Sequence, residues 1–283
     1  MDHEQLQLQA RYRELIQTYQ DVRVQDRVMG DDLSRELDLV ECTMLDNPPA
    51  GCRKGLVLPG EMDTPQGVPP LLSLTIEEAG IEVLSDEEIL ALIADRDRTP
   101  PARYVRGVFN QGKVGSCGAE SAVGALRTRR NQDGGDCPML NPYAVYNTTS
   151  GGIDRGSTLR DNLAFLQEFG CPSEAVWPRS HGWRKKPSNA AMDDALNYRI
   201  AKDGIVRVRN RREFQTMVLA GHPLYHGYTG HAIFGVDLLD LVRFEYQNSW
   251  GASWGNNGRG TLAYERIYWP YGCYAIVAVR GRG

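Results

Sequence analysis

Apolar and polar positions divide the chain into two regions of different texture. In the first region, apolar side chains recur at spacings of four, three, four and three residues, which is the period of a helix with one apolar face. This pattern predicts an amphipathic helix that ends near Gly30. Its inner face carries Leu8, Tyr12, Leu15, Tyr19 and Val22.

Shorter signals follow this helix. Residues 31–42 predict a second helix, and residues 47–70, rich in proline and glycine, predict a turn-rich connection. Residues 71–76 have the composition of a strand. Ser85 and Glu88 have the spacing of a capping box, which predicts a short helix that ends before the next proline.

The second region begins near Thr99, where helical patterns come first and strands follow. Helices are predicted over residues 117–130 and 158–170. The order of elements predicts an α+β domain of two lobes over residues 99–283, preceded by an N-terminal extension over residues 1–98. The strand-like runs are residues 204–210, 231–239, 242–250, 260–267 and 273–280.

Charge and composition exclude some partners. The formal net charge is −4, so we expect neither a nucleic acid nor a membrane as partner, and we interpret the basic clusters 127–130 and 207–212 as solvated surface. The N-terminus lacks the basic and apolar regions of a secretory signal. We therefore expect a cytoplasmic protein, or one carried in a particle such as a virion.

The six cysteines do not form a metal site or a dense disulfide framework. No two of them have the C-x-x-C spacing of zinc or redox sites. Cys42 and Cys52 are close enough in sequence to close a small loop, but a reduced pair is expected in the cytosol. No metal and no organic cofactor is predicted.

Three separate segments carry the residue types of a thiol nucleophile and its helpers. Gln111 and Cys117 lie six residues apart in "QGKVGSC", His231 opens a strand-like run, and Asn248 ends the next one. A thiol nucleophile needs a base to take its proton and a third group to orient that base. His222 and His226 are competing candidates for the base, but neither precedes an apolar run like "AIFGV".

These motifs resemble those of the papain-like cysteine peptidases. The Gln–Cys spacing, the segment Gly230-His231-Ala232, and "NSWGASWGNNGRG" at residues 248–260 fit the family pattern. The resemblance covers roughly residues 99–283. Within it, "GSTLRDNLAFLQEFGCPSEAVWP" is similar to the second helix of prokaryotic and viral members.

The resemblance implies a papain-like two-lobe fold and a role for each matched residue. Cys117 would be the nucleophile, His231 the base, Asn248 the group that orients it, and Gln111 an oxyanion donor, without a cofactor. Trp250 and Trp254 would support this set. The substrate backbone would contact Gly151, Gly152 and Ala232, although a simple turn is as good an interpretation of the two glycines.

Three departures from the family pattern stand beside the nucleophile. Val114 replaces a cysteine of the family's lobe-bracing disulfide, and its expected partner position near residues 149–150 also lacks a cysteine. Gly118 replaces a large aromatic residue. Glu120 is unusual one turn beyond the nucleophile, and we expect it to face solvent, because an inward carboxylate would oppose thiolate formation.

Two functions of different class remain open. The leading hypothesis is a cysteine endopeptidase that acts on peptides or proteins. Residues 1–98 would then be a prosegment lying across the cleft and removed by cleavage within residues 94–103. The alternative is a papain-fold structural or assembly protein, such as a virion component, that binds a partner through residues 1–98 and has little or no catalysis. An amidase or acyl transferase would use the same residues.

Overall fold

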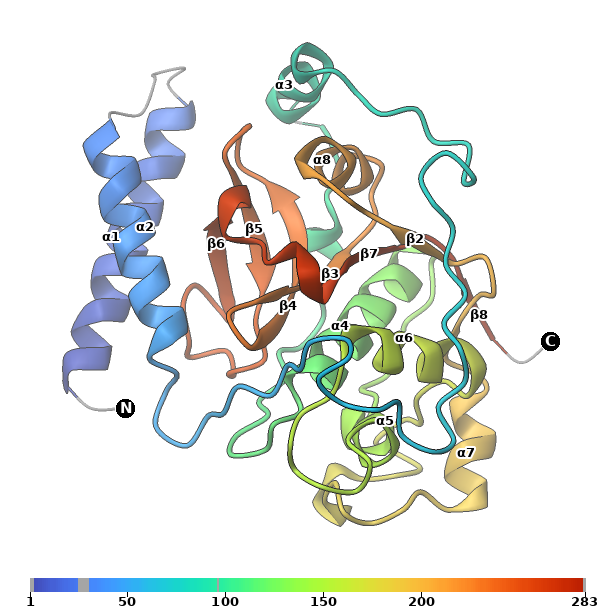
Figure 1. Ribbon diagram of the computed structural model, residues 1–283. Helices are drawn as coiled ribbons and strands as arrows, with labels where there is room; N and C mark the ends of the chain where they lie inside the picture. The colour runs from blue at the N-terminus through green and yellow to red at the C-terminus, as the bar shows by residue number, and fades with distance from the viewer. Residues whose placement is uncertain (1–2, 25–30, 96, 282–283) are drawn as a thin grey trace.

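The computed structural model describes residues 3–24, 31–95 and 97–281. Helices and strands segregate into two lobes (Figure 1). One lobe holds the helices α4 (Cys117–Gln132), α5 (Pro142–Thr149), α6 (Leu159–Glu168) and α7 (Asn189–Ala195). The other is built on a sheet and carries α8 (Arg211–Leu219).

The sheet lobe contains six strands, all antiparallel to their neighbours. Their order is β2-β7-β3-β4-β5-β6. The bounds are β2 Ile205–Arg207, β3 Leu224–Tyr228, β4 His231–Leu238, β5 Arg243–Gln247, β6 Arg259–Ala263 and β7 Cys273–Ile276. A separate pair joins β1 (Arg199–Ile200) to β8 (Val279–Arg280).

The two lobes meet along α4, which is buried on nearly every side. Its small residues Ala119, Ala122 and Ala125 have no exposed surface, so that β4 approaches the helix closely. Gly124 is required at this approach, because a Cβ there would lie 2.6 Å from the Phe234 ring. The beginning of α4 is thereby fixed beside the beginning of β4.

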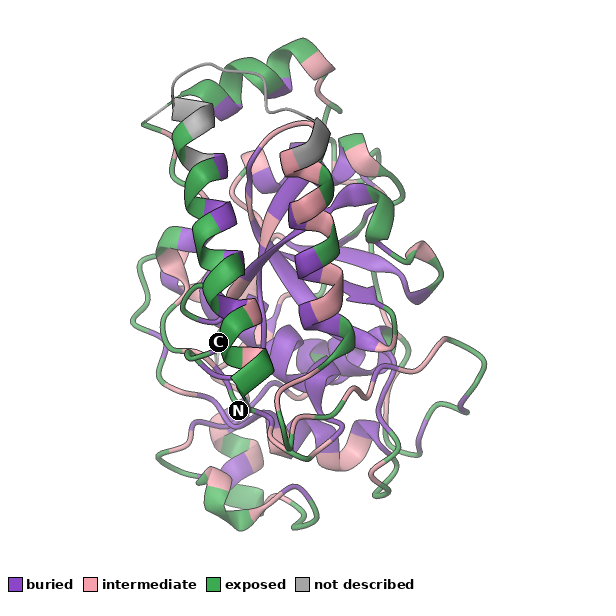
Figure 2. Ribbon diagram, turned by 90° about the vertical axis from the view of Figure 1, so that its left-hand side faces the viewer, coloured by how far each residue is buried: buried purple, intermediate pink, exposed green. Residues whose placement is uncertain are grey.

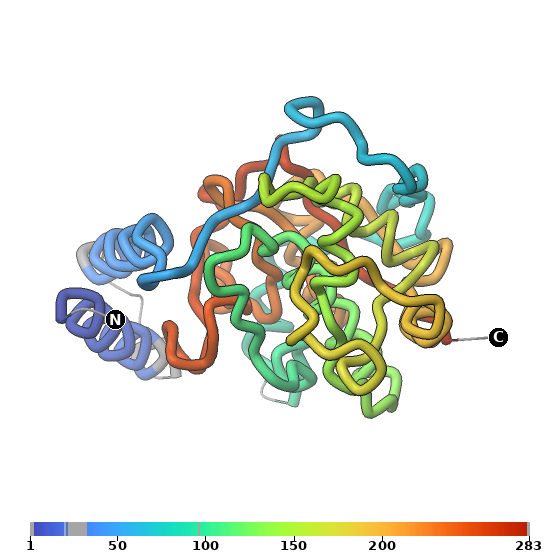
Figure 3. Tube along the Cα trace, turned by 90° about the horizontal axis from the view of Figure 1, so that it is seen from below, coloured from blue at the N-terminus to red at the C-terminus, as the bar shows by residue number. Residues whose placement is uncertain are grey.

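The N-terminal extension starts with a helical hairpin, α1 (His3–Val24) and α2 (Asp31–Asp46). It stands beside the sheet at the β6 edge, with its buried side turned toward the strands (Figures 2 and 3). Tyr12, Leu15 and Leu37 belong to the same apolar core as Phe244 of the sheet. The predicted apolar face of the first helix matches these buried positions, while residues 25–30 lie outside the described residues.

Buried charges also fix the hairpin. Arg243 of β5 has no exposed surface and pairs with Asp38 and Glu41 of α2. At the exposed end, Arg13 Nε donates to the carbonyl of Gly255 at 2.9 Å. The hairpin is therefore attached to the sheet lobe by both apolar and ionic contacts.

After the hairpin, the chain crosses the molecule before it reaches residues 99–283. Residues 47–76 pass over the helical lobe, where the Gln167 amide pairs with both backbone groups of Leu72. Helix α3 (Asp86–Ala94) begins at the predicted capping box and packs against α8. A 3-10 turn, η1 (Pro101–Tyr104), then leads back to α4.

Some sequence predictions of local structure are wrong. Residues 71–76 form no strand: Leu74 alone makes a bridge, with Val206 of β2. Helices α5, α7 and α8 and strand β3 were not predicted. Within the described part of the chain, no helix is both long and apolar enough to cross a bilayer.

Candidate active site

Cys117 is the first residue of α4 and is fully buried. Backbone N–H groups of Ala232, Gly55 and Gly118 point at its sulfur and lower the pKa of the thiol, but burial outweighs them and raises that pKa to about 11. Ala232 directly follows His231, so the sulfur lies at the start of β4. The sequence prediction that the helix start and this strand start meet matches the observed geometry.

His231 opens β4, and Asn248 directly follows β5. Nε2 of His231 lies 2.8 Å from Oδ1 of Asn248. Trp250 stacks on the imidazole with ring centroids 4.4 Å apart, and Trp254 packs edge-on against Trp250. Both indoles are nearly inaccessible to water, so the hydrogen bond between His231 and Asn248 lies in a low-dielectric surrounding.

The other ring nitrogen of His231 is free to act. Nδ1 is buried and has no hydrogen-bond partner among the described residues. Burial lowers the pKa of His231 to about 4; the bond with Asn248 raises it and the charge of Lys54 lowers it further. Burial therefore disfavours the charged forms of both the thiol and the imidazole while the site is closed.

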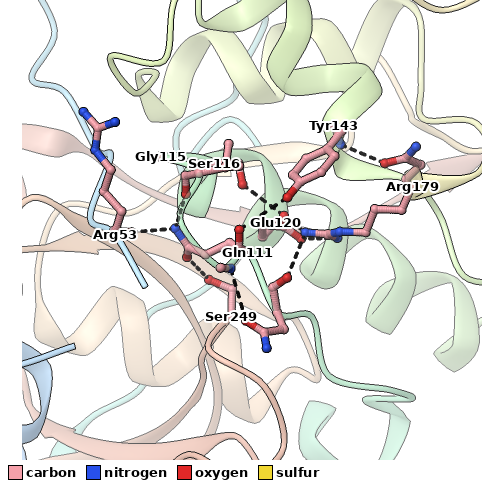
Figure 4. A network of polar contacts seen from close by, with 12 residues as sticks. Arg53, Gln111, Gly115, Ser116, Glu120, Tyr143, Arg179 and Ser249 are labelled. Atoms are coloured by element: carbon pink, nitrogen blue, oxygen red, sulfur yellow. Dashed lines mark hydrogen bonds and ion pairs between the residues drawn. The ribbon is translucent and has the colours of Figure 1, made fainter. Parts of the chain in front are cut away.

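Gln111, six residues before Cys117, is held by hydrogen bonds at both ends of its amide (Figure 4). Its Oε1 accepts from the Ser249 hydroxyl at 2.7 Å. Its Nε2 donates to the carbonyl of Arg53 at 2.6 Å and to that of Val114 at 2.9 Å. The Gln111 amide nitrogen therefore already binds two carbonyl oxygens, and one of them, that of Arg53, belongs to the N-terminal extension.

The segment 53–57, which we call the plug, covers this site. Leu56 N–H donates to Gly230 O on the sheet side, and on the helical side Gly55 O accepts from Ser157 N–H while Val57 N–H donates to Ser157 O. The Leu56 side chain lies against Gly227 of β3. The plug therefore bridges both lobes directly over Cys117.

The plug fits only because glycines line the contact. A Cβ on Gly55 would lie 2.1 Å from the carbonyl oxygen of Gly115, and one on Gly156 would lie 2.2 Å from that of Gly55. A real Cβ atom essentially never lies under 3.0 Å from another heavy atom. The backbone of the plug therefore packs directly on the backbone at Gly115 and Gly156. The expected position of the extension is thus partly corrected: the first helix lies on the sheet edge, and the strand predicted over 71–76 does not form. The short plug is what reaches the site.

Glu120 corrects another expectation, since it faces inward. It is fully buried, accepts from the Ser116 hydroxyl at 3.0 Å, and forms an ion pair with Arg179. The Arg179 guanidinium also stacks 4.2 Å from the centre of the Tyr143 ring. Figure 4 shows this network beside Gln111. The charge of Glu120 is offset by Arg179, which is why burial of this carboxylate is tolerated.

The residue that contacts the loop before Cys117 lies further along the chain than residues 149–150, where the partner position of the missing disulfide was expected. Asp154, rather than residues 149–150, reaches the Cys117 loop, where its Oδ1 accepts from Gly115 N–H at 2.9 Å and from the Tyr146 hydroxyl at 2.7 Å. Sequence analysis missed this residue. An isolated Asp in a Gly-rich loop gives no signal of its own.

Gly151 and Gly152 lie in an exposed turn with left-handed φ values of 67° and 78°. Ser157 makes the backbone bonds to the plug instead. We therefore expect Ser157, more than the two glycines, to pair with a substrate backbone. Ala232 donates toward the sulfur and its carbonyl accepts from Ser121.

The competing histidines lie elsewhere. His226 is buried in β3 among the rings of Phe214 and Phe244, and burial lowers its pKa to about 3. His222 lies before β3, near Arg129. The thiols of Cys42 and Cys52 are both free. No group of three or more potential metal ligands occurs in the described parts of the chain.

Comparisons with known proteins agree with this architecture. No protein-family model matches the chain. The chain is 27% identical over 189 residues to cathepsin K of Gallus gallus, covering 56% of each protein. It therefore spans about half the length of the curated relatives it matches.

Solved structures match over more of the chain. Xylellain, a cysteine protease from Xylella fastidiosa, has a TM-score of 0.53 at 21% identity and covers 77% of this chain and 99% of its own. Procathepsin L2 from Tenebrio molitor larval midgut has a TM-score of 0.53 at 15% identity, covering 98% and 94%. The chain thus has the fold of the papain-like cysteine proteases, as predicted, and its sequence similarity supports that family. A prokaryotic or viral subtype stays a prediction.

Proposed function

We propose that this chain is a papain-like cysteine endopeptidase that is held inactive by its own plug. The carrying observation is that the Gln111 amide donates to a peptide carbonyl, that of Arg53, two residues before the Gly55 N–H that points at the sulfur of Cys117. That is the contact an oxyanion donor would make with a substrate. A structural protein has no need of it.

The proposed reaction uses groups that already lie together. Once the plug leaves, water enters, the pKa of Cys117 falls and that of His231 rises, because the penalty of burial is the main cause of both shifts. His231 Nδ1 takes the thiol proton, and the thiolate attacks the substrate carbonyl. Gln111 and the Cys117 backbone N–H stabilise the oxyanion, and losing one such donor typically costs about 10²–10³ in rate.

The later steps regenerate the thiol. The imidazolium of His231 protonates the leaving amine, and water then hydrolyses the thioester with the same imidazole as base. Asn248 holds Nε2 and thereby fixes the orientation of the ring, which leaves Nδ1 to exchange the proton in both steps. Burial of the pair under Trp250 supports this orienting role.

Several findings support an inhibitory role for residues 1–98. The plug makes backbone hydrogen bonds to both lobes at the site. The charge of Lys54 lowers the pKa of His231. A protein described as a procathepsin aligns with 98% of the chain. We propose the boundary near residue 98 as the division between the extension and the peptidase region. The extension nevertheless shares an apolar core with the sheet lobe.

The rate of Cys117 alkylation against pH tests the proposal. In the intact chain we expect slow labelling by iodoacetamide that rises with pH without a plateau below pH 9, because the raised pKa keeps the thiol protonated. With the plug displaced, we expect fast labelling that persists to about pH 6 and needs His231. A midpoint near the free-thiol value of about 8.5 with the plug displaced, unchanged by His231→Ala, would refute the peptidase proposal.

Gly55→Ala provides the displaced plug. The added methyl group meets the Gly115 carbonyl at 2.1 Å, and overpacking of this size costs about 1–3 kcal/mol. We expect Cys117 labelling at pH 7.5 to accelerate about tenfold or more, read by mass spectrometry of the peptide containing Cys117. Cys42 in the same digest serves as reference.

Gly60→Asn is the matched control for this substitution. Gly60 lies in the same extension, with open space around it and a left-handed φ that asparagine tolerates. Its labelling rate should equal that of the unmodified chain. Equal rates for Gly55→Ala and Gly60→Asn would show that the plug does not control access to Cys117.

The alternative function stays a prediction. None of the relatives named above is described as a component of a particle. Binding of an assembly partner through residues 1–98 would also compete with the docking of the hairpin on its own sheet. Cytoplasmic or particle-borne location is likewise a proposal. The alkylation experiment also separates the two functions, since an assembly protein has no need of a histidine-dependent thiolate.

A further inference from the structure

Asp154 presents one carboxylate oxygen to the active-site cleft. Its Oδ1 is committed to the protein, through Gly115 N–H and the Tyr146 hydroxyl. Its Oδ2 lies 3.1 Å from Nη1 of Arg53, and only about a fifth of the Asp154 side chain is exposed. When the plug leaves, Oδ2 loses the cation that it contacts in the closed state.

Arg53 is also the residue whose carbonyl oxygen is bound by Gln111, at 2.6 Å. One residue of the plug is therefore recognised twice, through its carbonyl by the oxyanion donor and through its side chain by Asp154. In Figure 4 the Arg53 side chain extends away from Gln111. The next side chain, Lys54, goes elsewhere, to Asp46 and the Tyr228 ring.

This double contact does not depend on the direction in which a peptide crosses the site. The Cα of any residue is one bond from its carbonyl carbon. A residue with its carbonyl at Gln111 Nε2 therefore starts its side chain close to where that of Arg53 starts. An arginine there has the length to reach Asp154 in either direction, and its planar guanidinium presents several donors to a fixed carboxylate.

We propose that Asp154 is a specificity-determining residue that selects substrates with arginine at the position whose carbonyl is attacked by Cys117. The inference rests on the proposed peptidase function. Substrate arginine takes the place of Arg53, so that the plug and the substrate compete for the same two contacts. Lysine is bound less well, because its single ammonium lacks the planar arrangement of donors.

The expected size of the preference for arginine follows from the partial exposure of the ion pair between Arg53 and Asp154. Fully exposed ion pairs change affinity less than about fivefold, whereas hydrogen bonds between charged groups in fixed geometry are worth tenfold or more. Asp154 is held rigidly by two bonds but faces a cationic partner that is half exposed. We expect about a tenfold preference for arginine over a neutral side chain of the same shape.

Irreversible peptidyl acyloxymethyl ketones measure this preference on the full chain. Two probes are compared that differ only in carrying arginine or citrulline, its neutral isostere, next to the reactive ketone. Each must wait for the plug to leave, so the probes are used at concentrations at which labelling is first order in probe; opening of the plug is then a pre-equilibrium that cancels from the ratio of their rates with Cys117. The ratio is measured for the unmodified chain, Asp154→Asn, and Asp203→Asn.

Asp154→Asn keeps an acceptor for Gly115 and Tyr146 but removes the charge. Asp203→Asn makes the same charge change at an exposed position outside the cleft. We expect a ratio near ten for the unmodified chain and Asp203→Asn, falling below about three for Asp154→Asn. The citrulline probe and the melting temperature report whether Asp154→Asn still folds.

Two outcomes overturn the inference in distinguishable ways. A ratio near one in the unmodified chain, or a ratio that Asp154→Asn leaves unchanged, removes Asp154 as a selector while the peptidase proposal stands. Failure of both probes to label Cys117 in Gly55→Ala, where the plug is displaced, refutes the proposed function itself, and the inference with it.

Discussion

Replacing His231 by alanine in the Gly55→Ala background is expected to lower kcat/KM for an arginine-containing peptide by roughly four to six powers of ten. The imidazole is the group placed to take the thiol proton, since its Nδ1 is unpartnered and its Nε2 is fixed by Asn248. Without it, the thiol keeps a pKa near or above its ordinary value. The measurement is hydrolysis of a fluorogenic peptide between pH 5 and 9.

His222→Ala is the control for this experiment. His222 is one of the two other candidates from the sequence. It is followed by a proline and by strand β3, which is buried on both faces, and not by β4. Its removal should leave kcat/KM within a factor of about two. Activity of His231→Ala within tenfold of the parent, or loss of activity in His222→Ala alone, would show that the base has been assigned to the wrong residue.

Replacing Arg243 by leucine is expected to destabilise the docked hairpin by about 3–5 kcal/mol. The Arg243 side chain is fully buried and pairs with the carboxylate of Glu41, which is 2% exposed, and with that of Asp38. Leucine leaves a buried carboxylate without its cation. Urea unfolding and hydrogen exchange of residues 31–46 report the loss, and Cys117 labelling reports whether the plug loosens with the hairpin.

Two further variants distinguish the free-energy cost of leaving a buried charge unpaired from the cost of losing contact area. Arg13→Ala removes two hydrogen bonds at the surface, to the carbonyls of Gly255 and Ser253, and it should cost about 1 kcal/mol. Arg243→Met combined with Glu41→Met replaces the pair by apolar groups and should recover most of the lost stability. A cost below 1 kcal/mol for Arg243→Leu would mean that apolar contacts alone hold the hairpin.

The sequence locates the parts of the site that lie in local motifs. Helix α4 begins at Cys117 because Gly115 and Ser116 precede a run of helix-forming residues, and β4 begins at His231 after a glycine. The segment "NSWGASWG" places Asn248 beyond a strand. These signals are short-range, so that a pattern of neighbouring residues suffices to find them.

Strand β3 shows why other elements were missed. All five of its residues are buried, on both faces of the sheet, so it lacks the alternation of a half-buried strand. Its sequence, "LYHGY", also contains a glycine, which weakens the strand signal. Residues 71–76 show the opposite error, because their strand-like composition finds only one backbone partner, at Leu74.

Long-range pairing explains the errors at the site itself. Glu120 is buried because Arg179, 59 residues away in the chain, neutralises it. Arg53 meets Asp154 across 101 residues. No local pattern carries such a pairing, so the orientation of Glu120 and the role of residues 53–57 required the fold.

The plug is anchored by the segments that precede and follow it in the chain. This arrangement has a consequence for how the plug is released from the site. Upstream, the hairpin is fixed to the sheet lobe by Arg243, and downstream Leu72 and Leu74 are hydrogen-bonded to Gln167 and to β2. After a single cut within residues 94–103, both tethers remain and hold the plug near Cys117 at an effective concentration in the millimolar range. Dilution releases the plug only when the hairpin, the plug and the downstream segment all leave together. We therefore expect one backbone cut to be insufficient and activity to appear only when a second event, a further cut or undocking of the hairpin, breaks a tether.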